Sequence, residues 1–389
     1  MFNIRTYNAL SAKGLERFSD DKYIVGEACE APEGFMLRSQ KLHSEAVPDS
    51  LLAVARAGAG VNNIPVEQYT EQGIVVFNTP GANANAVKEL IVAGLLLGSR
   101  DIYGGMSYVQ ELDHMDDSGE MGKLLEKEKK RFAGSEVTGK TLGVVGLGAI
   151  GSIIANLALD LGMDVIGYDP AISVEAAWQL SSRVERMESL EKLLASADFV
   201  PLHVPAIPAT KHLINHKTLS GMKSTAKILN FAREEIVNTD DMVDALETGS
   251  IAGYISDFPT PALLGRKNVL LMPHIGASTA EAEENCAVMA ADQLKDFLEN
   301  GNIYNSVNYP PTKMSRNGGS RITFSNNNVP KVLGSVLSIL ADSEINVVDM
   351  VNKSRGEIAY NIIDVEGDIS TQLKEKIAQV DGVMRVRLL

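Results

Sequence analysis

The chain contains few cysteines and no long apolar segment, and both absences exclude classes of protein. Cys29 and Cys286 are the only cysteines among 389 residues. Their separation fits neither a metal-binding motif nor a disulfide framework, which indicates a reducing compartment. The first ten residues lack the apolar core of a signal peptide, and no run reaches the roughly 18 apolar residues that span a membrane. We therefore expect a cytoplasmic protein with no metal site and no membrane partner.

Basic residues are scarce relative to acidic ones. There are 36 Lys and Arg residues against 50 Asp and Glu residues, so the formal net charge is −14. Such a charge argues against nucleic acid or an anionic membrane as the principal partner. The net charge does not exclude small anionic substrates, because binding them needs only local positive charge. The length, with 45% hydrophobic residues, predicts two or three globular domains.

A glycine-rich segment near the middle of the chain has the pattern of a dinucleotide-binding unit. Thr141–Val145 predicts a buried strand, and Gly146, Gly148 and Gly151 follow it in the spacing G-x-G-x-x-G. The first glycine permits the turn into a helix, the second lets a pyrophosphate approach the backbone, and the third lets helix and strand pack closely. The N-terminus of the following helix favours phosphate charge.

The next predicted strand, Asp164–Tyr168, ends at an acidic residue. Asp169 lies 18 residues after Gly151. A carboxylate at this place accepts hydrogen bonds from the adenosine ribose and repels a 2′-phosphate. The sequence therefore predicts NAD, rather than NADP, as the cofactor.

Before residue 306 the chain alternates apolar strands with helical stretches, the pattern of an α/β protein. Chemically useful side chains follow several strands, at the edge where open parallel sheets bind ligands. The predicted strands include Phe2–Tyr7, Leu51–Ala57, Ile74–Phe77, Phe199–Val204, Ala226–Asn230 and Val269–Met272, and the loops of interest are residues 56–64, 78–85, 203–210, 230–238 and 273–279.

Three side chains in these loops suit a 2-hydroxy or 2-oxo acid substrate. His274 can accept an alcohol proton as hydride leaves, since imidazole titrates near neutral pH; a structural histidine is the alternative. Arg233 can clamp a carboxylate through two parallel hydrogen bonds; an ion pair with a neighbouring acid is the alternative. Arg56 supplies a guanidinium at a strand end, with a surface salt bridge as the alternative.

The C-terminal part of the chain has a different pattern. Residues 306–320 (SVNYPPTKMSRNGGS) combine adjacent prolines with glycine, serine and asparagine, and predict a linker. Residues 321–389 predict strands and helices in the order βαββαβ, which is a ferredoxin-like module. A module this small is suited to pairing with a second copy.

The motifs, in their order along the chain, resemble those of the D-isomer-specific 2-hydroxyacid dehydrogenase family. They are RAGAGVNNI, NTPGAN, GLGAIG…YDP, LHVPAIPATKHLI, NFAREEIVN and NVLLMPHIGAST. The resemblance covers about residues 50–305 and extends to the C-terminal module, which looks like an ACT regulatory domain. It implies a doubly wound, Rossmann-type NAD domain at residues 89–279 and a split, flavodoxin-like substrate domain at residues 1–88 and 280–305.

The same resemblance implies roles for individual residues. Arg233 and His274 would be catalytic, and Arg56, Gly58 and Asn83 would bind substrate. The residues that would bind the cofactor are Gly146, Gly148, Ala149, Ile150, Gly151, Asp169, His203, Pro205, Asp257 and Gly276.

Within the family, the chain is most similar to members that oxidise 3-phospho-D-glycerate to 3-phosphooxypyruvate with NAD, the first step of L-serine biosynthesis. Arg56 matches a basic residue associated with the substrate phosphate. The resemblance also implies a homodimer or homotetramer. Two alternatives stay open: another D-2-hydroxyacid dehydrogenase, such as a hydroxypyruvate or glyoxylate reductase, and a non-catalytic NAD-sensing regulator.

Two features depart from the family pattern. The glutamate that usually pairs with the catalytic histidine is missing from Ile255–Leu264, so Asp257, Glu234 or Glu235 would have to replace it, or the histidine acts alone. Glu234 itself stands where the family usually has glycine.

The ACT-like module carries a regulatory expectation. Asn328 and Asn346 match asparagines that contact L-serine in serine-inhibited relatives, which implies L-serine as an effector bound between two paired modules. Lys331 stands where serine-inhibited relatives often have a glycine, directly after Pro330. The alternative is that the module serves only for dimerisation.

Overall fold

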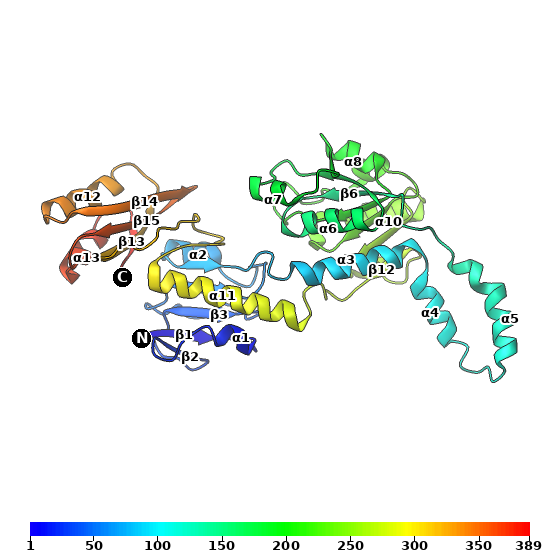
Figure 1. Ribbon diagram of the computed structural model, residues 1–389, viewed down its shortest axis with the longest axis horizontal. Helices are drawn as coiled ribbons and strands as arrows, with labels where there is room; N and C mark the ends of the chain where they lie inside the picture. The colour runs from blue at the N-terminus through cyan, green and yellow to red at the C-terminus, as the bar shows by residue number, and fades with distance from the viewer. The chain divides into compact units, whose positions relative to one another are not determined.

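Three separate sheets form the framework of the chain (Figure 1). The structure is a computed structural model that describes residues 1–389 apart from the side chain of Glu175. Its contacts divide the chain into two units, one made of Met1–Asn83 with Ala280–Leu389 and the other of Ala84–Thr279. None of the helices in this described chain combines the length and the apolar composition needed to cross a membrane.

The second unit is built on a parallel sheet of seven strands in the order β12-β11-β10-β9-β6-β7-β8. This is the doubly wound order of dinucleotide-binding folds, in which the strand sequence reverses between β6 and β9. The strands are β6 (Thr141–Val145), β7 (Asp164–Tyr168), β8 (Glu185–Arg186), β9 (Phe199–Leu202), β10 (Lys227–Asn230), β11 (Gly253–Ser256) and β12 (Val269–Leu271).

Helices cover both faces of this sheet, which is why its strands are apolar on both sides. Val144 lies in a core with residues of α3 and α6, whereas its neighbour Val145 lies in another core with residues of α8 and α10. The helices of the unit are α3 (Ala84–Ser99), α4 (Ile102–Gln110), α5 (Ser118–Glu128), η1 (Lys129–Phe132), α6 (Ala149–Asp160), α7 (Val174–Gln179), α8 (Leu190–Ser196), α9 (His216–Ser220), η2 (Glu234–Ile236), α10 (Thr239–Glu247) and η3 (Pro261–Leu263).

The first unit contains a parallel sheet of five strands in the order β2-β1-β3-β4-β5, which is the flavodoxin-like order. Long helix α11 (Ala280–Asn300) packs on it, with Leu294 and Phe297 in the same core as Ile4 and Phe77. The other elements are β1 (Phe2–Thr6), α1 (Ala12–Leu15), β2 (Tyr23–Gly26), β3 (Gly34–Leu37), β4 (Ala53–Arg56), α2 (Val66–Glu71) and β5 (Val75–Phe77).

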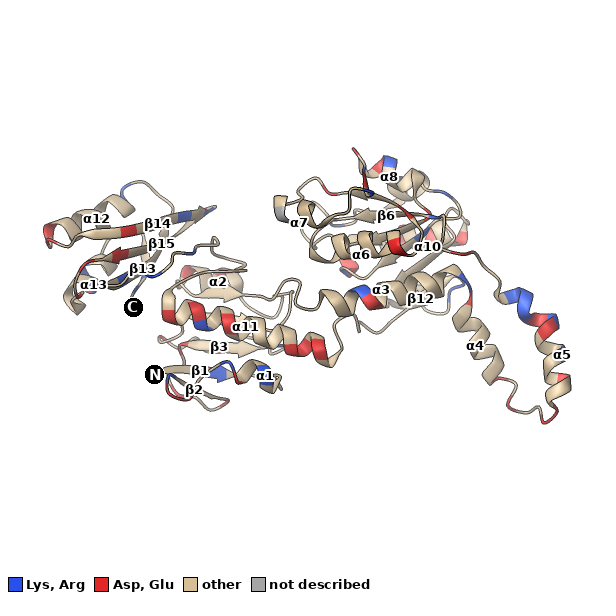
Figure 2. Ribbon diagram, viewed as in Figure 1, with Lys and Arg blue, Asp and Glu red and all other residues tan. Residues whose placement is uncertain are grey.

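The outer side of α11 is acidic (Figure 2), and basic residues from the start of the chain pair with it. The ion pairs join Lys13 to Glu284 at 2.6 Å, Arg17 to Asp292 at 2.7 Å and Lys22 to Glu299 at 3.5 Å. These pairs are largely exposed, so water screens them and each contributes little to the stability of the fold. They attach the first residues of the chain to a helix that follows almost 270 residues later.

The third sheet is antiparallel, with the order β14-β15-β13-β16 and the connectivity βαββαβ of the ferredoxin-like module. One face packs on α12 and α13, and the other contributes Tyr360 and Ile362 to the core beneath α11. Its elements are β13 (Ser320–Asn327), α12 (Val332–Asp342), β14 (Val347–Arg355), β15 (Ile358–Val365), α13 (Thr371–Ala378) and β16 (Val383–Leu388). The sequence-based prediction of the fold class is confirmed.

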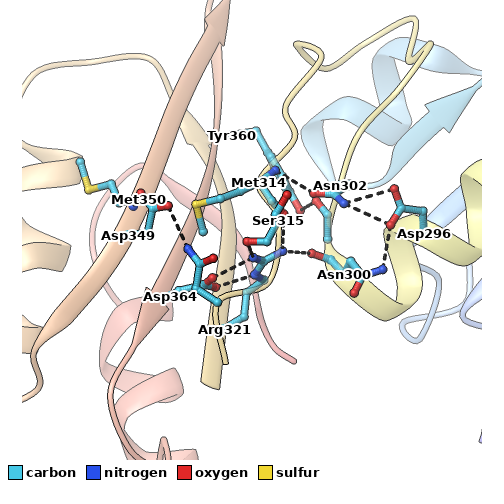
Figure 3. A network of polar contacts seen from close by, with 12 residues as sticks. Asp296, Asn300, Asn302, Met314, Ser315, Arg321, Asp349, Met350, Tyr360 and Asp364 are labelled. Carbon is cyan, nitrogen blue, oxygen red and sulfur yellow. Dashed lines mark hydrogen bonds and ion pairs between the residues drawn. The ribbon is translucent and has the colours of Figure 1, made fainter. Parts of the chain in front are cut away.

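A buried arginine joins this module to the rest of the first unit (Figure 3). Arg321 is 0% exposed and binds both carboxylate oxygens of Asp364, at 2.6 and 2.8 Å. It also donates to the backbone carbonyls of Asn300 at 2.8 Å, Met314 at 3.0 Å and Ser315 at 3.0 Å. These contacts use all the donor directions of the guanidinium, which explains how a full charge can be buried here.

The same module caps the C-terminal end of α11. The last carbonyls of a helix have no partner inside the helix. Arg387 donates to the carbonyls of Phe297 at 2.9 Å and Leu298 at 2.8 Å, and the Tyr360 hydroxyl donates to that of Gly301 at 2.8 Å. An arginine and a tyrosine thus donate to carbonyls at the end of α11, in addition to the bond from the N–H of Gly301 to the Phe297 carbonyl at 2.9 Å.

The segment that composition predicts as a linker, residues 306–320, is packed along part of its length. Tyr309 is 0% exposed and donates to the carbonyl of Thr70 at 3.1 Å. Thr312 pairs with Ile303 through two backbone hydrogen bonds. The prolines and asparagines that suggest a loose connection therefore lie in an extended segment fixed to the first unit.

Helices α4 and α5 differ from the other long helices of the second unit, because neither has a buried residue. Tyr103, Met106 and Val109 on α4 are 64%, 63% and 44% exposed. They recur at a spacing of three residues and so lie along one side of the helix.

Candidate active site

The glycine-rich turn lies at the carboxyl end of β6, beside the point where the strand order of the sheet reverses. Gly146 has φ +90°, and a Cβ there would lie 2.7 Å from the carbonyl oxygen of His203. A Cβ on Gly151 would lie 1.9 Å from the carbonyl oxygen of Gly146. Both glycines are therefore required by the fold itself.

Gly148 is different, because a Cβ there would meet nothing within 4 Å. The residue is exposed, immediately precedes α6, and provides no side-chain cap. The first N–H groups of α6, from Ala149 and Ile150 onward, lie at the positive end of a 12-residue helix. This combination of open space and helix dipole fits the pyrophosphate of a dinucleotide.

Asp169 directly follows β7, next to this turn. Its Oδ2 accepts a hydrogen bond from the N–H of Leu147 at 2.8 Å, and its Oδ1 accepts one from the N–H of Ala171 at 2.9 Å. The carboxylate thus fixes the glycine turn as well as standing where a ribose-binding acid is predicted. Each oxygen keeps a second lone pair for a hydroxyl group.

His203 follows β9, on the other side of the reversal point. Its ring atom Nε2 is buried without a hydrogen-bond partner among the described residues, although other parts of the residue are partly exposed. Burial lowers the pKa of His203 to about 4, so the imidazole is neutral near pH 7. An unpaired, buried polar atom beside the glycine turn fits a bound group that completes its hydrogen bonding. Pro205 lies exposed in the same loop.

Arg233 follows β10 and is held by a buried asparagine. The Nδ2 of Asn230 donates to the carbonyl of Arg233 at 2.9 Å, and its Oδ1 accepts from the N–H of Ala232 at 3.2 Å. The guanidinium of Arg233 is half-buried and donates to the Ala232 carbonyl at 2.6 Å. A guanidinium has five N–H donors, enough to bind a carboxylate in addition.

His274 lies in the loop after β12 and has an unusual backbone conformation. Its φ is +56°, in the left-handed region that non-glycine residues rarely adopt. The imidazole is exposed and lies 4.9 Å from the ring of Phe258, centroid to centroid. Asp257, which is only 2% exposed, accepts hydrogen bonds from the N–H of Ile275 at 2.9 Å and of Gly276 at 2.8 Å.

The segment that lacks the family glutamate forms a short turn, η3, in which Leu263 is buried and Pro261 and Ala262 are exposed. Of the three acids that the sequence offers as replacements, Glu234 and Glu235 are exposed on η2. Both oxygens of Asp257 are engaged by backbone N–H groups. Among the described side chains, no group of three or more His, Cys, Asp or Glu residues gathers as a metal site would require.

Two of the substrate residues predicted in the first unit, Arg56 and Gly58, lie at the carboxyl end of β4. The Nε of Arg56 donates to the carbonyl of Arg38 at 3.0 Å. Gly58 has φ +154°, and a Cβ there would lie 2.6 Å from Nη1 of Arg56, so glycine leaves room for the guanidinium. Asn83 ends the first stretch of the unit, in the loop before α3.

Arg38 was not predicted as a site residue. It follows β3, whose residue Leu37 is aligned with Arg56 of the neighbouring β4. Two arginines thus occupy adjacent strand ends, and Arg38 also forms a 2.6 Å ion pair with Glu283. The apolar triplet Phe35–Leu37 before Arg38 is the signal that could have revealed it, because it is the same pattern that precedes Arg56.

The two predicted effector residues lie at opposite ends of α12. Asn328, before the helix, donates from Nδ2 to the carbonyl of Gly356 at 3.1 Å. Asn346 follows the helix and is exposed. The 11 residues of α12 rise about 16 Å, so one small ligand cannot contact both asparagines of a single chain.

Known proteins similar to this chain agree in their family. The family model for the D-isomer specific 2-hydroxyacid dehydrogenase, NAD binding domain, matches residues 105–276. A D-3-phosphoglycerate dehydrogenase of Haemophilus influenzae is 33% identical over 357 residues, which cover 89% of this chain and 82% of that relative. One of Synechocystis is 39% identical over 287 residues, covering 72% of this chain and 49% of the relative.

Solved structures share the fold of this chain. A crystal structure of a Thermus thermophilus protein has a TM-score of 0.65 and 28% identity, covering 79% of this chain and 100% of that one. The NAD+-bound 3-phosphoglycerate dehydrogenase of Entamoeba histolytica has a TM-score of 0.61 and 24% identity, covering 79% and 98%, and shares the fold. Because the Haemophilus influenzae relative is 33% identical and is covered over 82% of its length, the chain belongs to the D-isomer-specific 2-hydroxyacid dehydrogenase family, as an NAD-dependent member similar to the D-3-phosphoglycerate dehydrogenases.

Proposed function

We propose that this chain oxidises 3-phospho-D-glycerate to 3-phosphooxypyruvate, the reaction that begins L-serine biosynthesis. The observation that carries the proposal is the pair of guanidinium groups at adjacent strand ends, Arg38 and Arg56, in a chain whose relatives are named D-3-phosphoglycerate dehydrogenase. Two arginines suit a phosphate dianion, which a reductase of unphosphorylated acids would not need to bind.

The reaction needs a carboxylate anchor and a proton acceptor, and the second unit offers both. Arg233 binds the substrate carboxylate, because its loop is fixed by Asn230 and its guanidinium has donors to spare. His274 takes the proton of the C2 hydroxyl group during oxidation and returns it to the carbonyl oxygen during reduction. NAD, when bound at the glycine turn, supplies the acceptor for the hydride from C2.

The cofactor residues are assigned on the same grounds. The N–H groups that begin α6 after Gly148 bind the pyrophosphate, and Asp169 binds the ribose. The unpaired Nε2 of His203 would complete its hydrogen bonding with a bound cofactor. Its neutral form favours hydrogen bonding over charge pairing with the phosphates.

The test measures the rate at which the wild type and Arg56→Ala reduce 3-phosphooxypyruvate and hydroxypyruvate. The oxidation of NADH is the readout. We expect kcat/KM to favour the phosphorylated acid and to fall about 30-fold for that acid alone in the variant, the size of a lost charge-assisted contact. Arg17→Ala, which removes an arginine from a surface ion pair in the same unit, is the control and should change neither value.

Other outcomes of this assay decide between the alternatives. Equal rates with both acids, unchanged in Arg56→Ala, would identify a general hydroxyacid reductase. No turnover of any 2-oxo acid, with NADH binding retained, would identify an NAD-sensing regulator.

We also propose that the chain works as a homo-oligomer in which α4 and α5 contact a second copy. Helices of 9 and 11 residues with no buried residue are marginal on their own. A symmetric partner would cover Tyr103 and Met106. We expect sedimentation of the wild type to give a dimer or larger species and Tyr103→Ser/Met106→Ser to shift it toward the monomer; a wild-type monomer at micromolar concentration would refute the idea.

L-serine is proposed as an effector of the C-terminal module. Because Asn328 and Asn346 lie at opposite ends of α12, a shared ligand needs one asparagine from each of two copies. Inhibition of the same assay by L-serine, lost in Asn328→Ala, would support this role. Full activity at millimolar L-serine would contradict the effector role and would indicate that the C-terminal module serves only for dimerisation.

A further inference from the structure

The catalytic loop of this chain has to be positioned without the family glutamate. His274 is exposed, has a left-handed backbone conformation, and lies against the ring of Phe258. A non-glycine residue keeps such a backbone only when the surrounding contacts enforce it. Those contacts come from Asp257 rather than from a partner of the imidazole.

The two oxygens of Asp257 bind two consecutive N–H groups directly after His274. Oδ1 accepts from Ile275 at 2.9 Å and Oδ2 from Gly276 at 2.8 Å. Asp257 is 2% exposed, so these charge-assisted bonds form away from competing water. Losing them would leave a buried carboxylate without partners, so the loop cannot leave this arrangement easily.

The neighbours of Asp257 are fixed by the same short segment. The N–H of Asp257 donates to the carbonyl of Asn230 at 3.1 Å, which joins it to the strand that precedes Arg233. The Ser256 hydroxyl accepts from the N–H of Phe258 at 3.0 Å, and this fixes the ring beside the imidazole. Two residues that follow β11 thus fix the loop of His274: Asp257 binds its backbone, and Phe258 contacts its imidazole ring.

Gly276 permits the close approach. A Cβ at this position would lie 3.2 Å from Oδ2 of Asp257, tighter than ordinary contact. A side chain here would push the loop away from the carboxylate. The glycine is therefore part of the same arrangement.

We propose that Asp257 is the positioning residue of His274, and that it acts through the backbone of residues 275 and 276 instead of pairing with the imidazole. This assigns Asp257 a role other than direct contact with the cofactor. It also explains how the loop is ordered where the family glutamate is absent.

The test compares Asp257→Asn with the wild type. The amide keeps the shape of the side chain but turns a donor toward one N–H group, so one of the two bonds is lost. We expect hydrogen–deuterium exchange of residues 274–279 to accelerate at least about tenfold, because one of its protecting bonds is gone. We also expect kcat to fall about 10- to 100-fold, the effect of a misplaced acid–base group, with the Kd of NADH changed less than about threefold.

The control is Asp241→Asn, which alters a carboxylate that accepts from the N–H of His216 at 2.9 Å, outside the loops of the site. It should change neither kcat nor exchange at residues 274–279. If Asp257→Asn does not fold, Gly276→Ala provides the test, with the same effects expected at smaller size.

Three results would overturn the inference. Exchange of residues 274–279 could be unchanged, the loss could fall on NADH binding with kcat retained, or the pH profile of kcat could move along the pH axis, which would indicate direct pairing with His274. The kcat measurement rests on the proposed dehydrogenase function. The exchange measurement does not, so an inactive wild type would refute the function and leave the positioning role to be decided by exchange.

Discussion

Two polar regions of this molecule differ in how completely their hydrogen bonds are made. Where the C-terminal module meets α11, Arg321 and Arg387 are buried and donate to carboxylate and carbonyl oxygens within the chain. At the carboxyl ends of β6 and β9, Nε2 of His203 has no partner in the described structure, and the space next to Gly148 is open.

The difference distinguishes polar groups that stabilise the fold from polar groups that are available to bind a ligand. A buried charge in a permanent contact needs every donor satisfied, because an unpaired one destabilises the fold. A ligand-binding site contains unpaired polar groups and open space, because the ligand forms the missing hydrogen bonds and fills the space. Buried arginines alone would have suggested a site in the C-terminal module, and the complete set of partners around the Arg321 guanidinium argues against it.

The largest effect is expected where the complete network is broken. Asp364→Asn removes the charge that Arg321 faces and leaves a buried guanidinium poorly compensated, so the free energy of unfolding of the first unit should fall by about 3–5 kcal/mol. Urea unfolding followed by circular dichroism measures this loss.

An exposed ion pair of the same chemistry provides the control. Glu247→Gln removes the partner of Arg266, and Glu247 is 60% exposed, so the change should be below about 1 kcal/mol. Similar losses in the two variants would remove the distinction between the buried network and an ordinary surface pair.

A smaller effect is expected from the incomplete region, and it depends on pH. The pKa of His203 is lowered by burial to about 4 in the folded chain, against an ordinary value near 6.5. Between these values the unfolded chain binds the extra proton, so the stabilising contribution is complete above pH 6.5 and is lost as pH falls toward 4. At pH 5 the loss should be about 2 kcal/mol.

His203→Gln isolates this contribution from that of the many carboxylates. Between pH 7 and pH 5 the wild type should lose about 2 kcal/mol more unfolding free energy than the variant. His216→Gln, at an exposed histidine, should behave like the wild type. A parallel decline in wild type and His203→Gln would mean that His203 is not buried as a neutral base.

Much of the fold follows from local sequence. The parallel sheet of the second unit could be predicted from the sequence, because buried strands such as Thr141–Val145 are mostly apolar runs. The glycine spacing identifies the turn after β6. Strands β2 and β3 were not predicted, because each contains a glycine at one end, and a glycine beside three apolar or aromatic residues predicts a turn as readily as a strand. That omission also concealed Arg38.

The site was predictable in residue types but not in contacts. His274 and Arg233 lie in loops after β12 and β10, as the strand pattern predicts. The bonds from Ile275 and Gly276 to Asp257 could not be predicted, because they join residues 18 and 19 positions apart through a loop conformation that no periodicity records. The packing of Tyr309 was equally hidden, since prolines and asparagines occur in both loose and fixed extended segments.

The place of α11 in the sequence has a consequence for biosynthesis. The second unit is one continuous stretch, Ala84–Thr279, and every strand of its sheet is synthesised before α11. The sheet of the first 83 residues has to wait with one face uncovered until α11 emerges, and the end of α11 then waits for Arg321 and Arg387. Synthesis thus completes the cofactor-binding unit first and the sheet at the start of the chain last, with its apolar face exposed for most of translation.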